Sequence, residues 1–321
     1  TDATFYTGPV DDMVVRNVAF SNITIGAFYV EDTTEQAGSA KLTIGAGNTY
    51  SNVAHQLALS GTSPTVGFTD GEIGVSTTYV RSARNYYNDP SPVILTVANA
   101  SINQGIGYTN AAGTVSVEAG TFSENVIINK GVAVQGPFFG VPGHDAMRTG
   151  AGEAVLSPPT GRAVRINADN VRLDGLTVSD VNDSAIVSGG NYGGGSTNVE
   201  VVNNRIIDVH SGSGLYTNGD PVSGRVSNWT VRDNLFRNID LAIGSGINLW
   251  KATGGTISDN LVENSGHSGI QLNSSIGIDI TDNRISNTAA NGINVAESQD
   301  ITVIGNLISN ANTSNDADSA G

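Results

Sequence analysis

Hydrophobic and polar positions repeat as one unit between Gly246 and Ala311. In each copy, short apolar–polar alternations are separated by turns rich in Gly, Asn, Asp and Ser. A Gly-Ile step begins the copies at Gly246, Gly269 and Gly292, which gives a period of 23 residues. Alternation with a period of two predicts β-strands whose Ile, Leu and Val side chains face one side. We therefore predict about three short strands in each copy.

Asparagines follow the same period. One Asn ends the second alternation of each copy, and another follows four residues later at Asn264, Asn287 and Asn310. A unit this short must stack on its neighbours to bury its apolar face, and strands in stacked coils lie about 4.8 Å apart. An Asn at the same corner of every coil can bond to the next coil and tolerates a left-handed backbone. We predict a structural column of Asn204, Asn234, Asn260, Asn283 and Asn306.

These patterns predict an all-β fold, a single-stranded β-solenoid with about 23 residues per coil. A helical repeat would need a longer run with a 3.6-residue period, and a propeller blade would need about 40 residues. We predict β-helical coils, or the end of a preceding array, over residues 1–90. The Pro-rich turn near residue 90 predicts a boundary. The main solenoid is predicted over 91–321, with a Gly- and Pro-rich lateral loop at 136–161.

The repeat resembles that of a known superfamily. GI-x-L…ITDNRISN and the opening TVSVEAGTFSENVIINKGVAVQG are similar to the repeats of pectate-lyase-like proteins, including NosD-like β-helix proteins. The resemblance covers residues 100–310 well and 1–80 loosely. It implies a right-handed parallel β-helix. The superfamily includes polysaccharide lyases, glycoside hydrolases, epimerases, tailspikes and adhesins, so the resemblance leaves the function open.

Aligned coils predict which side chains face outward. The coils begin at Ala185, Gly214, Gly246, Gly269 and Gly292. Two positions on, we predict an outward column of Val187, Tyr216, Asn248, Gln271 and Asn294. Four positions on, a second outward column holds Gly189, Asn218, Trp250, Asn273 and Ala296. The positions between them are predicted to face inward: Ser188, Thr217, Leu249, Leu272 and Val295.

Amides and aromatic rings together are typical of sugar binding, because rings stack on pyranoses and amides bond to hydroxyl pairs. The alternative is an ordinary solvated sheet face. The loops Asn191–Ser196 and Asn218–Gly224 are predicted to flank this face and to supply Tyr192 and Asp220. The substrate-binding candidates are therefore Tyr192, Tyr216, Asp220, Asn248, Trp250, Gln271 and Asn273.

Three residues are catalytic candidates. The resemblance to polysaccharide lyases implies that Lys251 removes a proton from a uronate whose carboxylate is neutralised by Ca²⁺ or Arg. The alternative is a solvated surface Lys. His210 and Asp240 are predicted to be hydrogen-bonded neighbours in adjacent coils, because each lies two residues after the second ladder position, Asp208 or Asn238. A carboxylate-oriented His can act as a general base, although such pairs also occur on turns without a function.

Composition narrows the classes of partner. A net charge of −15 argues against nucleic acid, because binding phosphates needs a basic surface. Acidic residues favour solubility or, alternatively, Ca²⁺ binding, so calcium is the one cofactor left open, and no metal ligands are assigned. The chain has no Cys and no apolar run of transmembrane length. The paired-Asp and Gly-His-Gly steps of polygalacturonases and the Asp-Pro-His-Asp signature of alginate epimerases are missing.

We therefore predict an extracellular or cell-surface protein of bacterial type that binds or processes a polysaccharide, most naturally an acidic, uronate-containing one. If it is an enzyme, a polysaccharide lyase or a glycoside hydrolase is expected. The alternative is a non-catalytic structural or adhesive solenoid segment of a larger surface protein.

Overall fold

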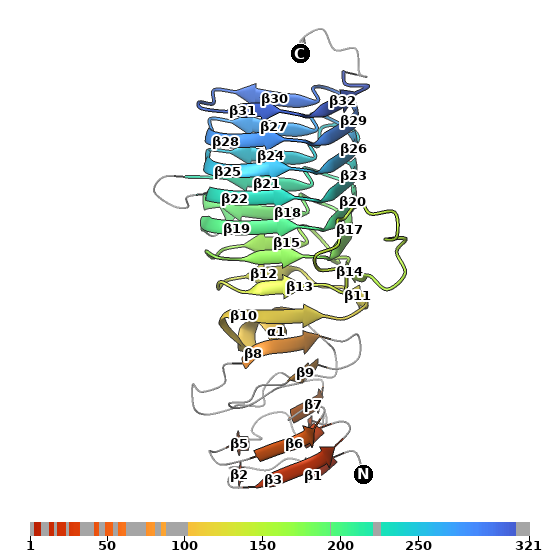
Figure 1. The fold of residues 1–321 in the computed structure, drawn as a ribbon, viewed down its shortest axis with the longest axis vertical. Helices are drawn as coiled ribbons and strands as arrows, with labels where there is room; N and C mark the ends of the chain where they lie inside the picture. Colours follow the sequence, from red (N-terminus) through yellow and green to blue (C-terminus); the bar gives the residue numbers. More distant parts are fainter. Residues whose placement is uncertain are drawn as a thin grey trace. The chain divides into compact units, whose positions relative to one another are not determined.

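The computed structural model describes residues 102–312 apart from 193 and 221–225. Before residue 102 it describes 3–7, 13–15, 18–23, 26–32, 42–44, 49–53, 57–61, 75–80 and 85–87. The chain divides into two compact units, Thr1–Glu118 and Ala119–Gly321. The predicted boundary near residue 90 lies outside the described residues. The second unit carries the regular repeats, which Figure 1 shows as a ladder of short strands.

Three parallel sheets make up the second unit. Sheet 1 runs through β12 (Val126–Ile128), β15 (Val164–Ile166), β18 (Ile186–Gly189), β21 (Leu215–Asn218), β24 (Ile247–Trp250), β27 (Ile270–Asn273) and β30 (Ile293–Ala296). Sheet 2 runs through β13 (Ala133–Gln135), β16 (Arg172–Asp174), β19 (Ser196–Val202), β22 (Val226–Arg232), β25 (Ala252–Ser258), β28 (Ile276–Thr281) and β31 (Thr302–Ile304). Sheet 3 runs through β11 (Gly120–Phe122), β14 (Ala154–Leu156), β17 (Thr177–Val181), β20 (Arg205–Val209), β23 (Leu235–Ile239), β26 (Leu261–Ser265), β29 (Arg284–Thr288) and β32 (Leu307–Ser309).

The chain visits sheets 3, 1 and 2 in turn, so each coil contributes one strand to each sheet. The solenoid has about eight turns with about 26 residues per turn. The 23-residue period holds from Gly246 onward, and insertions lengthen the coils before it. The aligned coil starts are confirmed, because Ile186, Leu215, Ile247, Ile270 and Ile293 are successive register partners in sheet 1. The predicted parallel β-solenoid is therefore confirmed.

Stacked aliphatic side chains fill the interior, and they explain why the coils begin with glycine. Ile247, Ile257 and Val262, one from each sheet of the same coil, are all 0 % exposed. A Cβ added at Gly246 would lie 2.5 Å from Val262 Cγ1 and 2.7 Å from the carbonyl oxygen of Gly269. At Gly269 the added Cβ would lie 2.4 Å from Ile285 Cγ2. The glycine column thus lets sheet 1 close over the side chains of sheet 3.

The predicted asparagine column is confirmed as a buried ladder at the corner between sheets 2 and 3. The backbone N–H of Asn234 donates to Asn260 Oδ1 at 3.0 Å, and that of Asn260 donates to Asn283 Oδ1 at 3.0 Å. Asn260 Nδ2 also donates to the carbonyl oxygen of Val231 at 2.8 Å. The same bonds continue to Asn204 and Asn306. These amides satisfy backbone groups that a buried corner would otherwise leave unpaired.

A second ladder lies at the outer surface of sheet 3. Asn264 donates to Asn238 at 2.9 Å, Asn287 to Asn264 at 3.1 Å, and Asn310 to Asn287 at 3.1 Å. Each of these residues has a positive φ, between 50° and 59°. Asn and Asp reach this left-handed region more readily than other residues with a side chain. Both Asn columns of the repeat are therefore scaffold.

The lateral segment between β13 and β14 lies along several coils, and it projects from sheet 3 in Figure 1. Its Arg148 and Glu153 form a buried ion pair at 2.7 Å. Arg148 also donates to the carbonyl oxygen of Asn203, and the Gly143 N–H donates to that of Asp233 at 2.7 Å. His144 Nε2 lies 3.0 Å from the carbonyl oxygen of Asp259. The loop is therefore attached at successive corners of the stack.

The first unit contains parallel pairs as well. Strand β2 (Met13–Val15) pairs with β5 (Leu42–Ile44), and β3 (Ala19–Ile23) with β6 (Thr49–Val53). Strands β1 (Ala3–Thr7), β4 (Gly26–Asp32), β7 (Leu57–Gly61), β9 (Asn85–Tyr87), β8 (Val75–Val80) and β10 (Thr109–Val117) are neighbours in that order.

Two features of this unit depart from the parallel repeat. Strand β9 is antiparallel to both of its neighbours, β7 and β8. The short helix α1 (Ile102–Tyr108) buries Ile102 and Ile106, and its sequence has too few turns for a visible helical period. In the part of the chain that the structure describes, no helix is long and apolar enough to cross a lipid bilayer.

We expect Asn260→Ala to destabilise the solenoid by about 1–3 kcal/mol, because it leaves buried backbone groups of two coils without partners. The comparison variant is Asn294→Ala, which removes a half-buried outward amide with no bond to a described residue. Urea unfolding followed by circular dichroism measures both variants. Equal free energies of unfolding for the two variants would contradict a stabilising role for the ladder.

Candidate functional site

The outer face of sheet 1 carries the two predicted columns in register. Tyr216, Asn248, Gln271 and Asn294 are successive partners. Asn218, Trp250, Asn273 and Ala296 form the second column in the same coils. We call the column Tyr216, Asn248, Gln271 and Asn294 the polar strip. Trp250 is 40 % exposed beside it, so an aromatic surface is accessible next to the amides.

Two residues differ in burial from what their predicted orientation implies. Val187 occupies the outward position next to Tyr216 but is 0 % exposed, so neighbouring side chains cover it. Val295 occupies the inward position after Leu272 but is 41 % exposed. Val295 lies on β30, beyond which no further strand of sheet 1 occurs among the described residues. The other inward residues of this column are buried as predicted: Ser188, Thr217, Leu249 and Leu272.

Aromatic and charged side chains meet at one end of the strip. The rings of Tyr192 and Tyr216 make an edge-to-face contact with centroids 5.8 Å apart. The Arg162 guanidinium lies 4.6 Å from the centroid of the Tyr192 ring and forms an ion pair with Asp183 at 3.0 Å. Edge-to-face rings and a stacked guanidinium each stabilise a fixed geometry. The loop after β18 thus brings Tyr192 to the strip, as the sequence predicts.

Burial changes the acidity of both tyrosines. It raises the pKa of Tyr216 to about 12, and the neighbouring Tyr192 adds to the increase. Burial also raises the pKa of Tyr192, although the positive charge of Arg162 opposes that increase. Both hydroxyls are therefore protonated near neutral pH and can donate hydrogen bonds.

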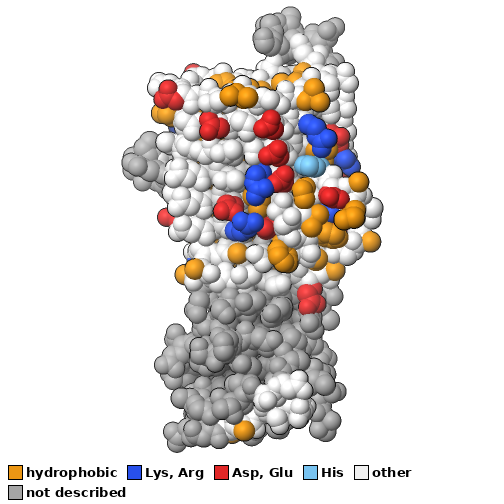
Figure 2. All heavy atoms as spheres, viewed as in Figure 1, with side chains coloured by type: hydrophobic (Ala, Val, Ile, Leu, Met, Phe, Trp, Pro, Cys, Tyr) orange, Lys and Arg blue, Asp and Glu red, His pale blue; other side chains and the backbone are white. Residues whose placement is uncertain are grey.

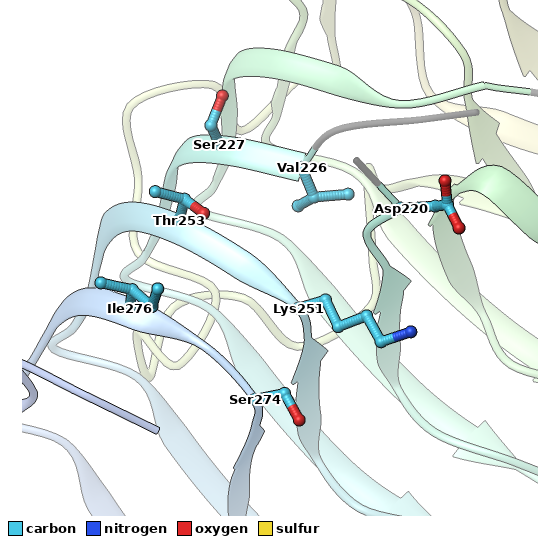
Figure 3. Close-up of a pocket in the computed structure, with 7 residues that line it drawn as sticks. All are labelled: Asp220, Val226, Ser227, Lys251, Thr253, Ser274 and Ile276. Carbon is cyan, nitrogen blue, oxygen red and sulfur yellow. The ribbon is translucent and has the colours of Figure 1, made fainter. Parts of the chain in front are cut away.

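Lys251 and Asp220 line one pocket of about 390 Å³ at the corner between sheets 1 and 2. Its other lining residues are Val226, Ser227, Thr253, Ser274 and Ile276. Figure 3 shows the Lys251 and Asp220 side chains at one end and Ser227, Thr253 and Ile276 at the other. The Lys251 ammonium also lies 5.8 Å from the centroid of the Trp250 ring. Part of the predicted loop Asn218–Gly224 lies outside the described residues.

A hydroxyl network that the sequence analysis did not identify lies on the other side of the strip. The Ser245 hydroxyl donates to Gln271 Oε1 at 3.1 Å. His267 Nδ1 lies 3.1 Å from the hydroxyl of Ser268 and 3.5 Å from that of Ser245. Ser245 and Ser268 are 1 % and 0 % exposed, so neither hydroxyl can reach a bound substrate as a nucleophile. The network instead holds Gln271 and His267 in place.

The predicted hydrogen bond between His210 and Asp240 is wrong. His210 Nε2 lies 3.7 Å from Asp180 Oδ1, and both side chains are exposed. The Asp240 carboxylate accepts from the backbone N–H of Gly212 at 2.8 Å and of Ala242 at 3.2 Å. Strand register does align the two coils, but Asp240 turns into its own loop with a φ of 24° and stabilises that loop. The two candidates therefore form no catalytic dyad.

Several charged side chains elsewhere form ion pairs. Figure 2 shows acidic and basic side chains side by side in a band on one face of the second unit. Arg172 contacts Asp174 and Glu200, and Arg237 contacts Glu263 at 2.7 Å. Among the residues that the structure describes, no three Asp, Glu or His side chains lie close enough together to hold a metal ion.

Comparison with known proteins identifies the fold. Residues 162–319 match the family model described as "Right handed beta helix region". No curated protein matches the chain.

We expect Tyr216 to make stability fall as the pH rises above about 10. Its pKa is about 12 in the folded protein, above the value of about 10 in an unfolded chain, so between these values the unfolded state binds fewer protons. Tyr216→Phe keeps the ring and removes the titrating hydroxyl, so its stability should fall less over this range. Urea unfolding at several pH values compares the two proteins. Identical pH dependence would contradict the assigned burial of the hydroxyl.

Proposed function

We propose that this chain, which over residues 162–319 belongs to the right-handed β-helix family, binds a polysaccharide along the outer face of sheet 1. The observation that carries the proposal is the register of the polar strip. Tyr216, Asn248 and Gln271 follow one another at one residue per coil, and Trp250 stands beside them. A linear polymer whose units recur along its length is a ligand suited to side chains that recur along the stack.

The chemistry of the strip favours sugars over other polymers. Aromatic rings offer flat apolar faces to pyranose rings, while amides donate to and accept from neighbouring hydroxyls. The Tyr192 ring contacts Tyr216 at one end of the strip, and Trp250 is exposed beside the strip, so both rings can contact a chain laid along it. The Ser245–Gln271 hydrogen bond fixes one of the amides in advance, which lowers the entropic cost of binding.

An acidic, uronate-containing glycan is the polymer that the local charge supports. The protein has a net charge of −15, so an anionic ligand needs local cations. No ion pair joins Lys251 to any residue that the structure describes. Its ammonium lies beside Trp250, where it can meet a carboxylate of the ligand. If the protein also cleaves the glycan, we propose that Lys251 abstracts the proton from the uronate, with or without Ca²⁺.

Such polymers lie outside the cell, so we place the protein in the extracellular space or at a bacterial cell surface. A second candidate is a structural or adhesive solenoid segment without catalysis. The absence of a bond between His210 and Asp240 favours it, as do the continuous Asn ladders. The two candidates differ in glycan binding and turnover.

We expect Trp250→Ala to weaken binding to a uronate oligosaccharide by about tenfold, because one exposed aromatic contact is worth about 1–2 kcal/mol. The matched control is Phe139→Ala, which removes an aromatic side chain that is 59 % exposed on the lateral loop. Isothermal titration calorimetry measures both variants, and thermal unfolding should change little in either. Equal affinity of Trp250→Ala and the native protein would remove this face as the binding site.

A glycan panel, with and without calcium, tests the function itself. Binding is read by calorimetry and lyase turnover by the absorbance of unsaturated products. Binding without products supports a binding protein, and products that vanish in Lys251→Ala support its role as the base. A panel with neither binding nor products would contradict the proposal and favour the structural solenoid.

A further inference from the structure

The outward column of sheet 1 extends beyond the polar strip. Register continues from Tyr216 through Val187 to Arg165 and then to Ile127. Adjacent strands lie about 4.8 Å apart, so Arg165 and Tyr216 flank Val187 on either side. Val187 faces outward and yet is 0 % exposed, which requires its neighbours to lie over it. Arg165 therefore lies on the same face, between Ile127 and Val187 and two strands from Tyr216.

Arg165 has no partner for its charge among the residues that the structure describes. No hydrogen bond or ion pair joins it to any residue that the structure describes, and its Nε is buried without an acceptor. Only the Nε of Arg165 is both buried and unpaired. The two terminal nitrogens of its guanidinium reach the surface. A guanidinium stays protonated in proteins, and a buried N–H without an acceptor is unfavourable. An arginine held in this way is suited to an anionic oxygen supplied from outside.

Arg162, the neighbouring arginine, is less suited than Arg165 to bind an external anion. Arg162 lies three residues earlier, and its charge is balanced by Asp183 at 3.0 Å. Its guanidinium is also stacked on Tyr192, whose ring contacts Tyr216. The Arg162–Asp183 pair is therefore neutral overall, and the charge of Arg165 stays uncompensated at this end of the face. Two aromatic rings and one unpaired cation surround the same outward position.

We propose that Arg165 is the anion-binding subsite of this face. It takes the carboxylate of an acidic sugar unit whose ring lies against Tyr216 and Tyr192, while the following units continue over Asn248 and Gln271 toward Lys251. This inference rests on the proposed function and names the end at which the acidic unit binds. The planar guanidinium can pair with both carboxylate oxygens, which an ammonium cannot do with the same geometry. It also explains how a protein of net charge −15 can hold an acidic polymer.

The test follows the Nε–Hε resonance of Arg165 by nitrogen-15 NMR, assigned by its loss in Arg165→Gln. The probes are an oligomer of galacturonic acid, the same oligomer with its carboxyls reduced to alcohols, and free galacturonate. We expect the two acidic probes to shift the resonance and the reduced oligomer to leave it unchanged. Arg165→Gln should weaken binding of the acidic oligomer by about tenfold or more and binding of the reduced oligomer hardly at all. Arg165→Lys should recover only part of this loss.

Arg284→Gln is the matched control, since it removes the same charge from an exposed site on sheet 3. If the acidic oligomer binds without shifting Arg165 and Arg165→Gln binds it normally, the subsite is wrong and the proposed function stands. If free galacturonate shifts Arg165 but no oligomer binds, the subsite stands and the proposed polysaccharide function fails. If no probe binds and no resonance moves, both are wrong.

Discussion

The buried hydrogen bonds between successive asparagines are the interaction on which the structure of the second unit depends. Each coil is too short to enclose a core by itself, so the coils must stack, and stacking has to satisfy the polar backbone of a sharp buried corner. Asn234, Asn260 and Asn283 do this by accepting from one coil and donating to another. A one-residue slip would break these bonds and turn the aliphatic side chains outward. Register is therefore fixed at every coil.

Fixed register is also what gives the outer face its chemistry. Residues far apart in the chain, such as Arg165, Tyr216 and Gln271, fall into one line because each occupies the same position in its coil. The scaffold and the site therefore use different positions of the same repeat. Regular coils supply the amides of the strip. The longer coils before Gly246 supply the loop that carries Tyr192, and they add Asp220, Val226 and Ser227 to the Lys251 pocket.

Much of this could be predicted from the sequence, because a 23-residue period is visible without any knowledge of contacts. The Asn ladder, the coil starts and the alternation of Tyr216, Thr217 and Asn218 all follow from it. Contacts that depend on a turn's own conformation could not be predicted. Asp240 bends into its loop instead of toward His210, and Val187 is buried although it occupies an outward position. Arg165 was missed because the alignment began one coil too late, although its register position was available in the sequence.

We propose that register assembles a glycan-binding strip on sheet 1, while the buried Asn ladder serves as scaffold alone. Side-chain amide spectra of Asn and Gln, recorded by nitrogen-15 NMR during titration with a galacturonic acid oligomer, distinguish the two columns. We expect the amide signals of Asn248, Gln271 and Asn294 to shift together and saturate at one concentration. Those of Asn234, Asn260 and Asn283 should stay in place. Shifts confined to sheets 2 and 3, with the strip unchanged, would contradict it.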